Sequence, residues 1–222
     1  MSRVQRHTDH ATLVARLTAE LRPVEPLPPP WRRLGSWCGI AAGVVVVATL
    51  VGLREDVLAV LGRPRFAMEV ATLLVAAGSA AAAALVAAVP GYGGSRVLAG
   101  VAAALSMVAF ALLGTSEAST ASSVLVGMRC ASCVVLFSAL PGAALFLAVR
   151  RAAPLRTRRI AAYLGAAGFL VGLASVRVAC PFDAPAHVFA WHVVPALVGI
   201  AVAARAAEAS LDRWRTALDA TA

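Results

Sequence analysis

Thiol side chains are the residues of this sequence with the most distinctive chemistry, and three of its four cysteines fall in two short segments. Cys130 and Cys133 occur in the segment MRCASC, and Cys180 occurs in ACPFD. The i, i+3 spacing of the first two places both thiols on one face of a helix. Thiolates are nucleophiles, form disulfides and bind soft metal ions. Cys38 lies apart in an apolar segment, where a small buried residue is expected.

These cysteines allow three interpretations. The first is that they are small interfacial residues without chemistry. The second is a redox pair, in which Cys180 forms a disulfide with Cys130 or Cys133 in an oxidising compartment. The third is a site that binds Cu(I), zinc or a toxic heavy metal ion transiently, because such ions prefer thiolate and imidazole ligands. No obligatory cofactor is expected. The candidate ligands for such an ion are Met128, Cys130, Cys133, Cys180, His187 and His192.

The composition indicates which elements must position these side chains. Hydrophobic residues make up 60% of the chain and charged residues 14%, and the mean hydropathy is +0.82. Soluble domains have about 45–50% apolar and about 25% charged residues, so a chain of this length could not bury its apolar side chains in water. The composition also excludes a disordered chain and a disulfide-dense secreted scaffold. It predicts an all-α polytopic membrane protein, a bundle of six transmembrane helices.

Six apolar segments are long enough to cross a bilayer as helices. A helix of about 20 residues spans a hydrocarbon core of roughly 30 Å, and lipid forces the backbone to satisfy its own hydrogen bonds. The predicted spans are residues 34–53, 66–89, 96–114, 130–149, 158–176 and 187–205. The membrane domain would thus comprise residues 34–206, flanked by a cytoplasmic arm of residues 1–33 and a cytoplasmic C-terminal tail of residues 207–222.

All twenty basic residues are arginine, and their distribution predicts the orientation. With the N-terminus in the cytoplasm, fifteen arginines lie in inner segments and five in outer segments. Because positive residues are enriched on the cytoplasmic side, both termini are expected in the cytoplasm of a bacterial inner-membrane protein. Cys130, Cys133 and Cys180 then lie on the periplasmic side. The net charge of +9 is interpreted as topological, and direct nucleic-acid binding is not expected.

Several single residues carry expectations about the membrane boundaries. Trp31 and Trp37 fit an aromatic belt at the inner interface. Arg177 is expected to mark the outer interface of the fifth span, and Glu69 to pack or cap in the first turn of the second span. The first span is expected to act as an uncleaved anchor, because no signal peptide is recognisable.

Residues 1–33 form an arm of different character. A helix is predicted from about residue 9 to residue 22, with Thr8 or Asp9 as its cap. Prolines in residues 23–30 predict a stiff spacer of polyproline type that ends at the membrane. The apolar stripe of the predicted helix consists of Leu13, Val14, Leu17 and Leu21.

The apolar stripe of the arm needs an apolar surface, because an isolated helix of about 13 residues is marginal in water. One candidate is a groove on a soluble partner, which would receive the stripe as a helix in a groove. The other is the lipid surface, to which arginine would add attraction. Both remain open at this point, and the stiff spacer favours the partner.

Several stretches along the chain resemble the NrsF family of negative regulators of the extracytoplasmic-function (ECF) sigma factor F. The resemblance covers nearly the whole chain in the same order. The stretches are residues 17–33 (LTAELRPVEPLPPPWRR), 63–66 (RPRF), 127–130 (GMRC), 140–141 (LP), 150–156 (RRAAPLR), 180–181 (CP) and 191–195 (WHVVP).

The resemblance implies a six-span anti-sigma factor that is not an enzyme. In that family the cytoplasmic N-terminal segment sequesters an ECF sigma factor. Two outer cysteines, which fall here on Cys130 and Cys180, are associated with sensing heavy-metal or oxidative stress. Cys133 and the weakly acidic segment after Cys180 depart from the family pattern.

Two other functions fit parts of the sequence. A membrane thiol–disulfide oxidoreductase would use the same outer cysteines, but no quinone or haem site is recognisable. A small metal transporter would need ionisable or thiol residues deep in the spans, and the middles of the spans offer little beyond serine and tyrosine. The sequence leaves the inducing signal and the oligomeric state open.

Overall fold

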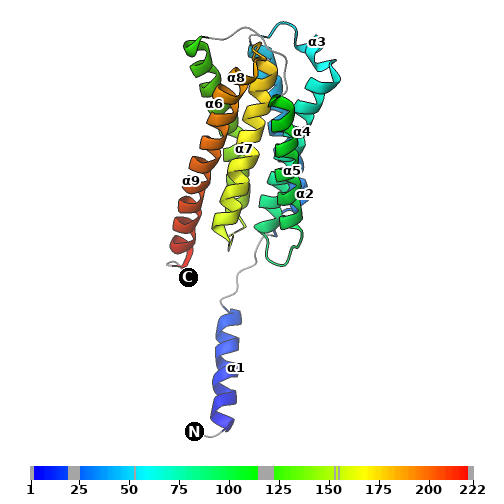
Figure 1. Cartoon of the computed structure of the whole chain (residues 1–222). Coiled ribbons are helices and arrows are strands. Elements are labelled where there is room, and N and C mark those ends of the chain that lie inside the picture. The colour runs from blue at the N-terminus through cyan, green and yellow to red at the C-terminus, as the bar shows by residue number, and fades with distance from the viewer. Residues whose placement is uncertain are drawn as a thin grey trace.

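The computed structural model describes residues 3–19, 26–52, 54–114, 123–152, 154 and 156–219, and the regular elements in these ranges are helices, without any strand. The helices stand side by side as an elongated bundle, and α1 lies apart from it beyond one end (Figure 1). The elements are α1 (Arg3–Ala19), α2 (Pro30–Val51), α3 (Val57–Leu61), α4 (Pro64–Ala87), α5 (Ser95–Gly114), α6 (Val124–Arg150), α7 (Thr157–Ala179), α8 (Pro185–Val188), the π-helical turn η1 (Phe189–Val193) and α9 (Val194–Asp219).

Six helices of the described chain are long and apolar enough to span a membrane, which confirms the predicted fold class. They are α2, α4, α5, α6, α7 and the continuous segment α8–η1–α9, with lengths from 19 to 30 residues. Three of them begin at a proline, namely Pro30, Pro64 and Pro185, where the fixed φ suits the first helical turn. The last helix continues to Asp219, so most of the predicted C-terminal tail is helical.

Helix α7 is the centre of the bundle and packs against α2, α4, α6 and α9. Small residues allow the close approach. A Cβ built on Gly172 would lie 2.1 Å from Ser138 Oγ and 2.5 Å from the Val134 carbonyl oxygen of α6. Helices that associate in lipid gain their attraction from such close backbone contact. The contact fixes α7 against α6 directly below the cysteines that these two helices carry.

Helix α2 is fastened to α6 by side chains near its start. The indole N–H of Trp37 donates to the Pro141 carbonyl at 2.9 Å, and Arg33 donates to the Ala148 carbonyl. Trp37 is therefore buried, and its predicted place in the interface belt is wrong, whereas Trp31 is 65% exposed. Cys38 follows Trp37 by one helical position and points away from the bundle, so the prediction that it is buried is also wrong.

The arm helix begins earlier than predicted. Because α1 starts at Arg3, Thr8 and Asp9 lie inside it and do not cap it. Leu13 and Val14 of the predicted stripe are 53% and 58% exposed. The side chain of Leu17, and residues 20–25 with Leu21, lie outside the described part of the chain.

The spacer between the arm helix and the bundle is described from residue 26. Residues 26–29 are non-helical, and Pro29 has φ −59° and ψ 151°, which is polyproline geometry. The spacer ends at Pro29, one residue earlier than predicted, because Pro30 is the first residue of α2.

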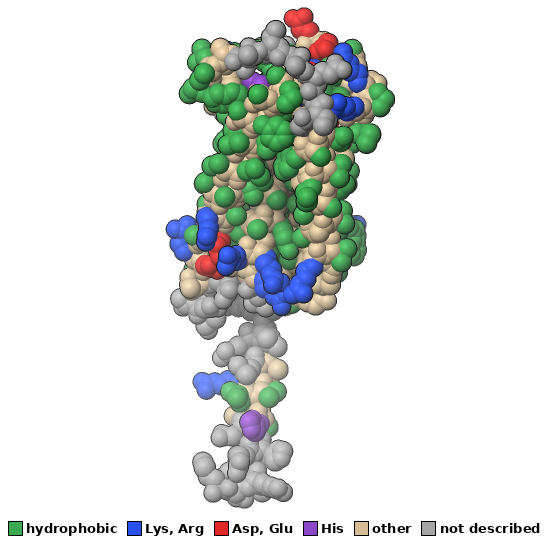
Figure 2. Space-filling model, in the orientation of Figure 1, with side chains coloured by type: hydrophobic (Ala, Val, Ile, Leu, Met, Phe, Trp, Pro, Cys, Tyr) green, Lys and Arg blue, Asp and Glu red, His purple; other side chains and the backbone are tan. Residues whose placement is uncertain are grey.

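The two ends of the bundle differ. The termini end is next to α1 and the chain's C-terminus, and the cysteine end carries α3 and α8 (Figure 1). Between the ends the face in view is covered largely by hydrophobic side chains, and charged side chains, most of them arginine, gather near both ends of the bundle (Figure 2). This pattern fits a hydrocarbon core crossed by the helices.

Candidate functional site

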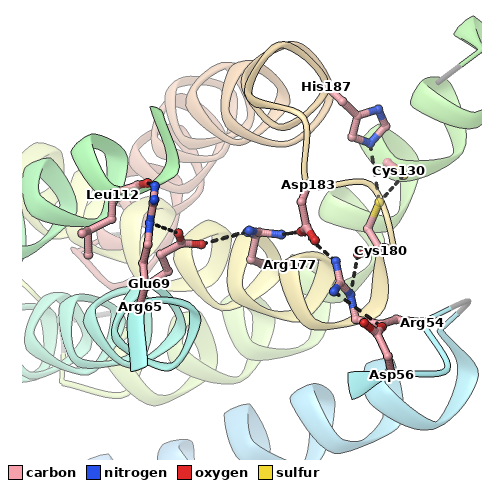
Figure 3. Close-up of polar contacts among 10 residues, drawn as sticks. All are labelled: Arg54, Asp56, Arg65, Glu69, Leu112, Cys130, Arg177, Cys180, Asp183 and His187. Atoms are coloured by element: carbon pink, nitrogen blue, oxygen red, sulfur yellow. Dashed lines mark hydrogen bonds and ion pairs between the residues drawn. The ribbon is translucent and has the colours of Figure 1, made fainter. Parts of the chain in front are cut away.

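Two thiols and two imidazoles meet at the cysteine end. Cys130 comes from α6, Cys180 directly follows α7, His187 comes from α8, and His192 comes from η1. One ligand atom of each residue lies within 4.8 Å of those of the other three. Figure 3 shows the Cys180 sulfur between Cys130 and His187. We call these four residues the thiol–imidazole cluster.

The position of Cys180 follows from the proline after it. A residue that precedes proline avoids the helical region, so α7 ends at Ala179 and Cys180 takes an extended φ of −91° and ψ of 127°. Its backbone N–H still donates to the Val176 carbonyl at 2.9 Å. Cys180 is thus held at the end of the most buried helix of the bundle, and it is itself buried.

The π-helical turn brings the two histidines together. His187 and His192 are five residues apart, which in an α-helix would place them roughly 140° apart around the axis. The wider turn of a π-helix reduces this angle. The two rings consequently lie edge to face with centroids 5.0 Å apart, and both side chains are buried.

The distances within the cluster suit a tetrahedral metal ion. The Cys130 and Cys180 sulfurs are 3.6 Å apart, and the Cys180 sulfur is 3.5 Å from His187 Nε2. Bond lengths typical of zinc require about 3.8 Å between two sulfurs and about 3.6 Å between a sulfur and a nitrogen. Both ring nitrogens of His192 are buried without a hydrogen-bond partner in the described part of the chain. A buried imidazole in that state beside two thiols is suited to bind a metal ion.

The surroundings of Cys180 favour its thiolate. The hydrogen bond from the Cys130 thiol lowers the pKa of Cys180, burial opposes this shift, and His192 adds to it. The thiolate is the form that attacks electrophiles and binds metal ions. Cys180 therefore combines the position and the protonation state that both metal binding and oxidation require.

The other two predicted sulfur residues lie outside the cluster. Cys133 lines a cavity of about 260 Å³ between α2, α6 and α7, and Cys130 and Cys180 line the same cavity. Met128 is 56% exposed, and it precedes Cys130 by two positions, which places it on another side of α6. The structure thus brings together two of the three sensor cysteines and both histidines, and it leaves Met128 apart.

A network of ion pairs adjoins the cluster. Asp183 accepts from Arg54 at 2.7 Å and also pairs with Arg177, whose other guanidinium nitrogens donate to Glu69 Oε2 at 3.0 and 3.2 Å. Arg54 Nε also donates to the Cys180 carbonyl at 2.8 Å. Figure 3 shows this chain of contacts running from the cysteine loop to α4. Burial raises the pKa of Asp183, but the guanidiniums of Arg177 and Arg54 outweigh it and lower that pKa.

The network corrects two predictions from the sequence. Arg177 does not mark an interface, because its side chain is 2% exposed and paired on both sides. Glu69 is not in the first turn of its helix, which begins at Pro64, and it is equally buried. Both guanidiniums also make cation–π contacts with Phe66: those of Arg54 and Arg177 lie 5.4 and 4.7 Å from the centroid of its ring.

One known protein family matches most of the chain. The NrsF family, described as negative regulator of sigma F, matches residues 17–214. The chain belongs to the NrsF family. Membership implies negative regulation of a sigma factor, which makes a sigma factor the partner. No curated protein and no solved structure matches the chain.

The NrsF match covers most of the predicted site residues but not the first part of the arm stripe. It includes all four residues of the thiol–imidazole cluster and the four charged residues that link Cys180 to α4. Of the predicted arm stripe, it includes Leu17 and Leu21, while Leu13 and Val14 precede it.

The charged network was not predicted from the sequence, because Arg177 is 108 residues from Glu69 and Asp183 is 129 residues from Arg54. Arg54, Glu69, Arg177 and Asp183 come from four different segments. The one available signal was Glu69 itself, an acidic residue three positions after the first residue of a predicted span, since a buried carboxylate requires a partner.

Proposed function

We propose that this protein is a transmembrane anti-sigma factor of the bacterial inner membrane. Its arm helix sequesters an ECF sigma factor in the cytoplasm. The sigma factor is released when the thiol–imidazole cluster, on the periplasmic side, binds a heavy metal ion or is oxidised. The observation that carries the sensing half is the convergence of Cys130, Cys180, His187 and His192 within 4.8 Å.

Membership in the NrsF family supports a regulator rather than an enzyme. The arm supports the capture of a soluble partner. Leu13 and Val14 are exposed on a helix that lies apart from the bundle (Figure 1), so the fold itself does not cover them. An exposed apolar stripe on a single helix is suited to docking in a groove.

Two signals can act on the same thiols. A divalent ion such as Zn²⁺ or Cd²⁺ would take two thiolates and two neutral imidazoles and release the proton of the Cys130 thiol. An oxidant would instead remove two electrons from the Cys180 thiolate and the Cys130 thiol as the disulfide forms, the Cys130 proton would be released, and the oxidant would itself be reduced. The two buried histidines favour the metal, because a disulfide makes no use of them.

The path from the cluster to the arm runs through α2. A Cβ built on Gly52 would lie 2.8 Å from both Cα and Cβ of Ala179, so the end of α2 touches the residue before Cys180. Arg54 then binds the Cys180 carbonyl. The start of α2 follows the spacer of the arm directly. A shift of Cys180 on ligation therefore acts on the helix that carries the arm.

The test is capture and release by the full chain. The tagged protein, purified from the native membrane, is expected to retain a sigma factor and to release it on addition of Cd²⁺ or of hydrogen peroxide. Cys130→Ser and Cys180→Ser should retain the partner without releasing it, whereas Cys133→Ser should release it normally. Leu13→Asp with Val14→Asp should abolish capture.

The two halves of the proposal fail separately. Capture that survives both aspartates would contradict docking through the arm. Release that persists in Cys130→Ser and Cys180→Ser would contradict sensing at the cluster.

A further inference from the structure

A second cavity lies at the termini end of the bundle, far from the thiol–imidazole cluster. Its volume is about 310 Å³. Its walls come from the turn between α4 and α5, the first residue of α5 and the start of α7. Helices α5 and α7 both pack on α4, and the cavity lies between their ends. Neither the family match nor the proposed sensing mechanism gives it a role.

The cavity is lined by positive charge without a counter-charge. Arg156 and Arg159 both line it, and neither guanidinium has an ion-pair or hydrogen-bond partner among the residues that the structure describes. No acidic side chain of the described chain is part of its wall. The hydroxyls of Tyr92, Ser95 and Tyr163 line it as well. Two guanidiniums and three hydroxyl donors are the complement of a phosphate group.

The surroundings of the cavity indicate a lipid as the source of that phosphate. Two residues after Ser95, Val97 is 70% exposed, and Val101 and Val108 continue the same face of α5 with 42% and 47% exposure. This apolar face runs from the cavity along a helix that can span the membrane. A phosphate in the cavity would thus have an apolar surface beside it for acyl chains. Basic pockets at the ends of transmembrane helices bind anionic headgroups in this way.

We propose that the cavity between the α4–α5 turn and the start of α7 binds the phosphate of an anionic phospholipid through Arg156 and Arg159. The proposal is independent of sensing and of sigma-factor binding. It holds whichever compartment the termini end faces. A lipid bound there would join α4, α5 and α7 at the termini end of the bundle.

The test counts phospholipids retained by the full chain in neutral detergent, where no charged membrane surface contributes. Native mass spectrometry is recorded with phosphatidylglycerol or phosphatidylcholine added, each with and without inorganic phosphate. The wild-type chain should retain one phosphatidylglycerol in preference to phosphatidylcholine. Arg156→Gln with Arg159→Gln should weaken this binding by about 30-fold, since one arginine near anionic lipid contributes about fivefold.

The matched control removes two arginines outside the cavity. Arg158 and Arg213 are exposed and do not line it, and Arg158 lies between the two cavity arginines in sequence. Arg158→Gln with Arg213→Gln should change retention by less than about twofold. Arg159→Lys keeps the charge but loses the planar fork, so binding should be intermediate.

Two results would overturn the proposal. Equal loss in the cavity variant and in the control would show that only net charge matters. Inorganic phosphate that displaces phosphatidylglycerol at millimolar concentration would show a site for free phosphate. Should the double glutamine variant fail to fold, Arg159→Lys and Tyr163→Phe give the same comparison, and unchanged retention in both would contradict the proposal.

Discussion

In the proposed mechanism two histidines and two cysteines from four segments would supply the four ligands of a metal ion, so single substitutions in the cluster should change metal binding. His192 is the most informative of them, because it is fully buried and has no partner for either ring nitrogen within the described residues. A ligand is the simplest way to satisfy it.

His192→Gln should lower the affinity of the full chain for Cd²⁺ by at least about 100-fold, because even an outer-shell change at a metal site costs about 10–100-fold. Titration of the purified protein against a competing chelator measures this. Cys133→Ser is the control and should change the affinity by less than about threefold. An unchanged affinity in His192→Gln would mean that the imidazole is not a ligand.

The lowered pKa of Cys180 predicts its reactivity at low pH. An ordinary thiol, with a pKa near 9.0, loses its thiolate as the pH falls below that value, whereas Cys180 keeps its thiolate until the pH falls to its own lower pKa. Iodoacetamide should therefore alkylate Cys180 well below pH 7, as located by mass spectrometry.

The cause of that shift can be tested within the same assay. In Cys130→Ser the thiol hydrogen bond to Cys180 is lost, and the pH midpoint of alkylation should rise. Each unit of pKa changes the thiolate fraction about tenfold at a pH below both values. A midpoint that stays in place would contradict the role of Cys130.

At the scale of elements, the buried ion pair between α4 and α7 holds the cysteine end together. Arg177 and Glu69 are each 2% exposed. Removing one partner of a buried pair costs about 3–5 kcal/mol when the other charge is left unpaired, whereas replacing both by apolar residues is close to neutral. Arg177 keeps its pair with Asp183 when Glu69 is removed, so the cost should fall at the lower end of that range.

Glu69→Gln should accordingly lower the free energy of unfolding by about 3 kcal/mol. Glu69→Leu combined with Arg177→Met should recover most of it, as measured by denaturation in detergent. Arg63→Gln removes an exposed arginine at the same end and should have little effect. If the double variant is less stable than Glu69→Gln, the pair of Arg177 with Asp183 stabilises the fold more than its pair with Glu69 does, which contradicts the prediction.

The close contact between α6 and α7 gives a second prediction at this scale. Gly172→Ala should destabilise the bundle by about 1–3 kcal/mol, because its Cβ would overlap Ser138 and Val134. Gly78→Ala is the matched control in α4, since a Cβ there meets nothing within 4 Å. It should be neutral or slightly stabilising. Thermal unfolding of the two variants in parallel checks the comparison.

For the molecule as a whole, the sequence predicted what depends on local composition. The six spans follow from the length and hydropathy of the apolar segments. Three helices start a few residues earlier than predicted because a proline begins them, and α6 starts at Val124 because Ser123 caps it. The side of the bundle that a residue faces depends on its neighbours. Trp37 was predicted at the membrane interface and is buried, whereas its neighbour Cys38 was predicted to be buried and is exposed.

The candidate site was predictable only in part. Clustering of cysteines in two outer segments pointed to Cys130 and Cys180, and His187 and His192 were candidates by proximity in sequence. Their convergence depends on a π-helical turn, which has no recognisable sequence signal. The charged network depends on long-range packing of α4 against α7 and of the Arg54 segment against the cysteine loop.

In the proposed mechanism the thiol–imidazole cluster and the arm face opposite compartments. A membrane-impermeant maleimide, applied to intact cells that produce the full chain with Cys38→Ser, measures this most directly. Cys133 should be labelled in intact cells, whereas a cysteine introduced by His10→Cys, on the exposed surface of α1, should be labelled only after the cells are opened. Labelling of both from the same side would contradict the account.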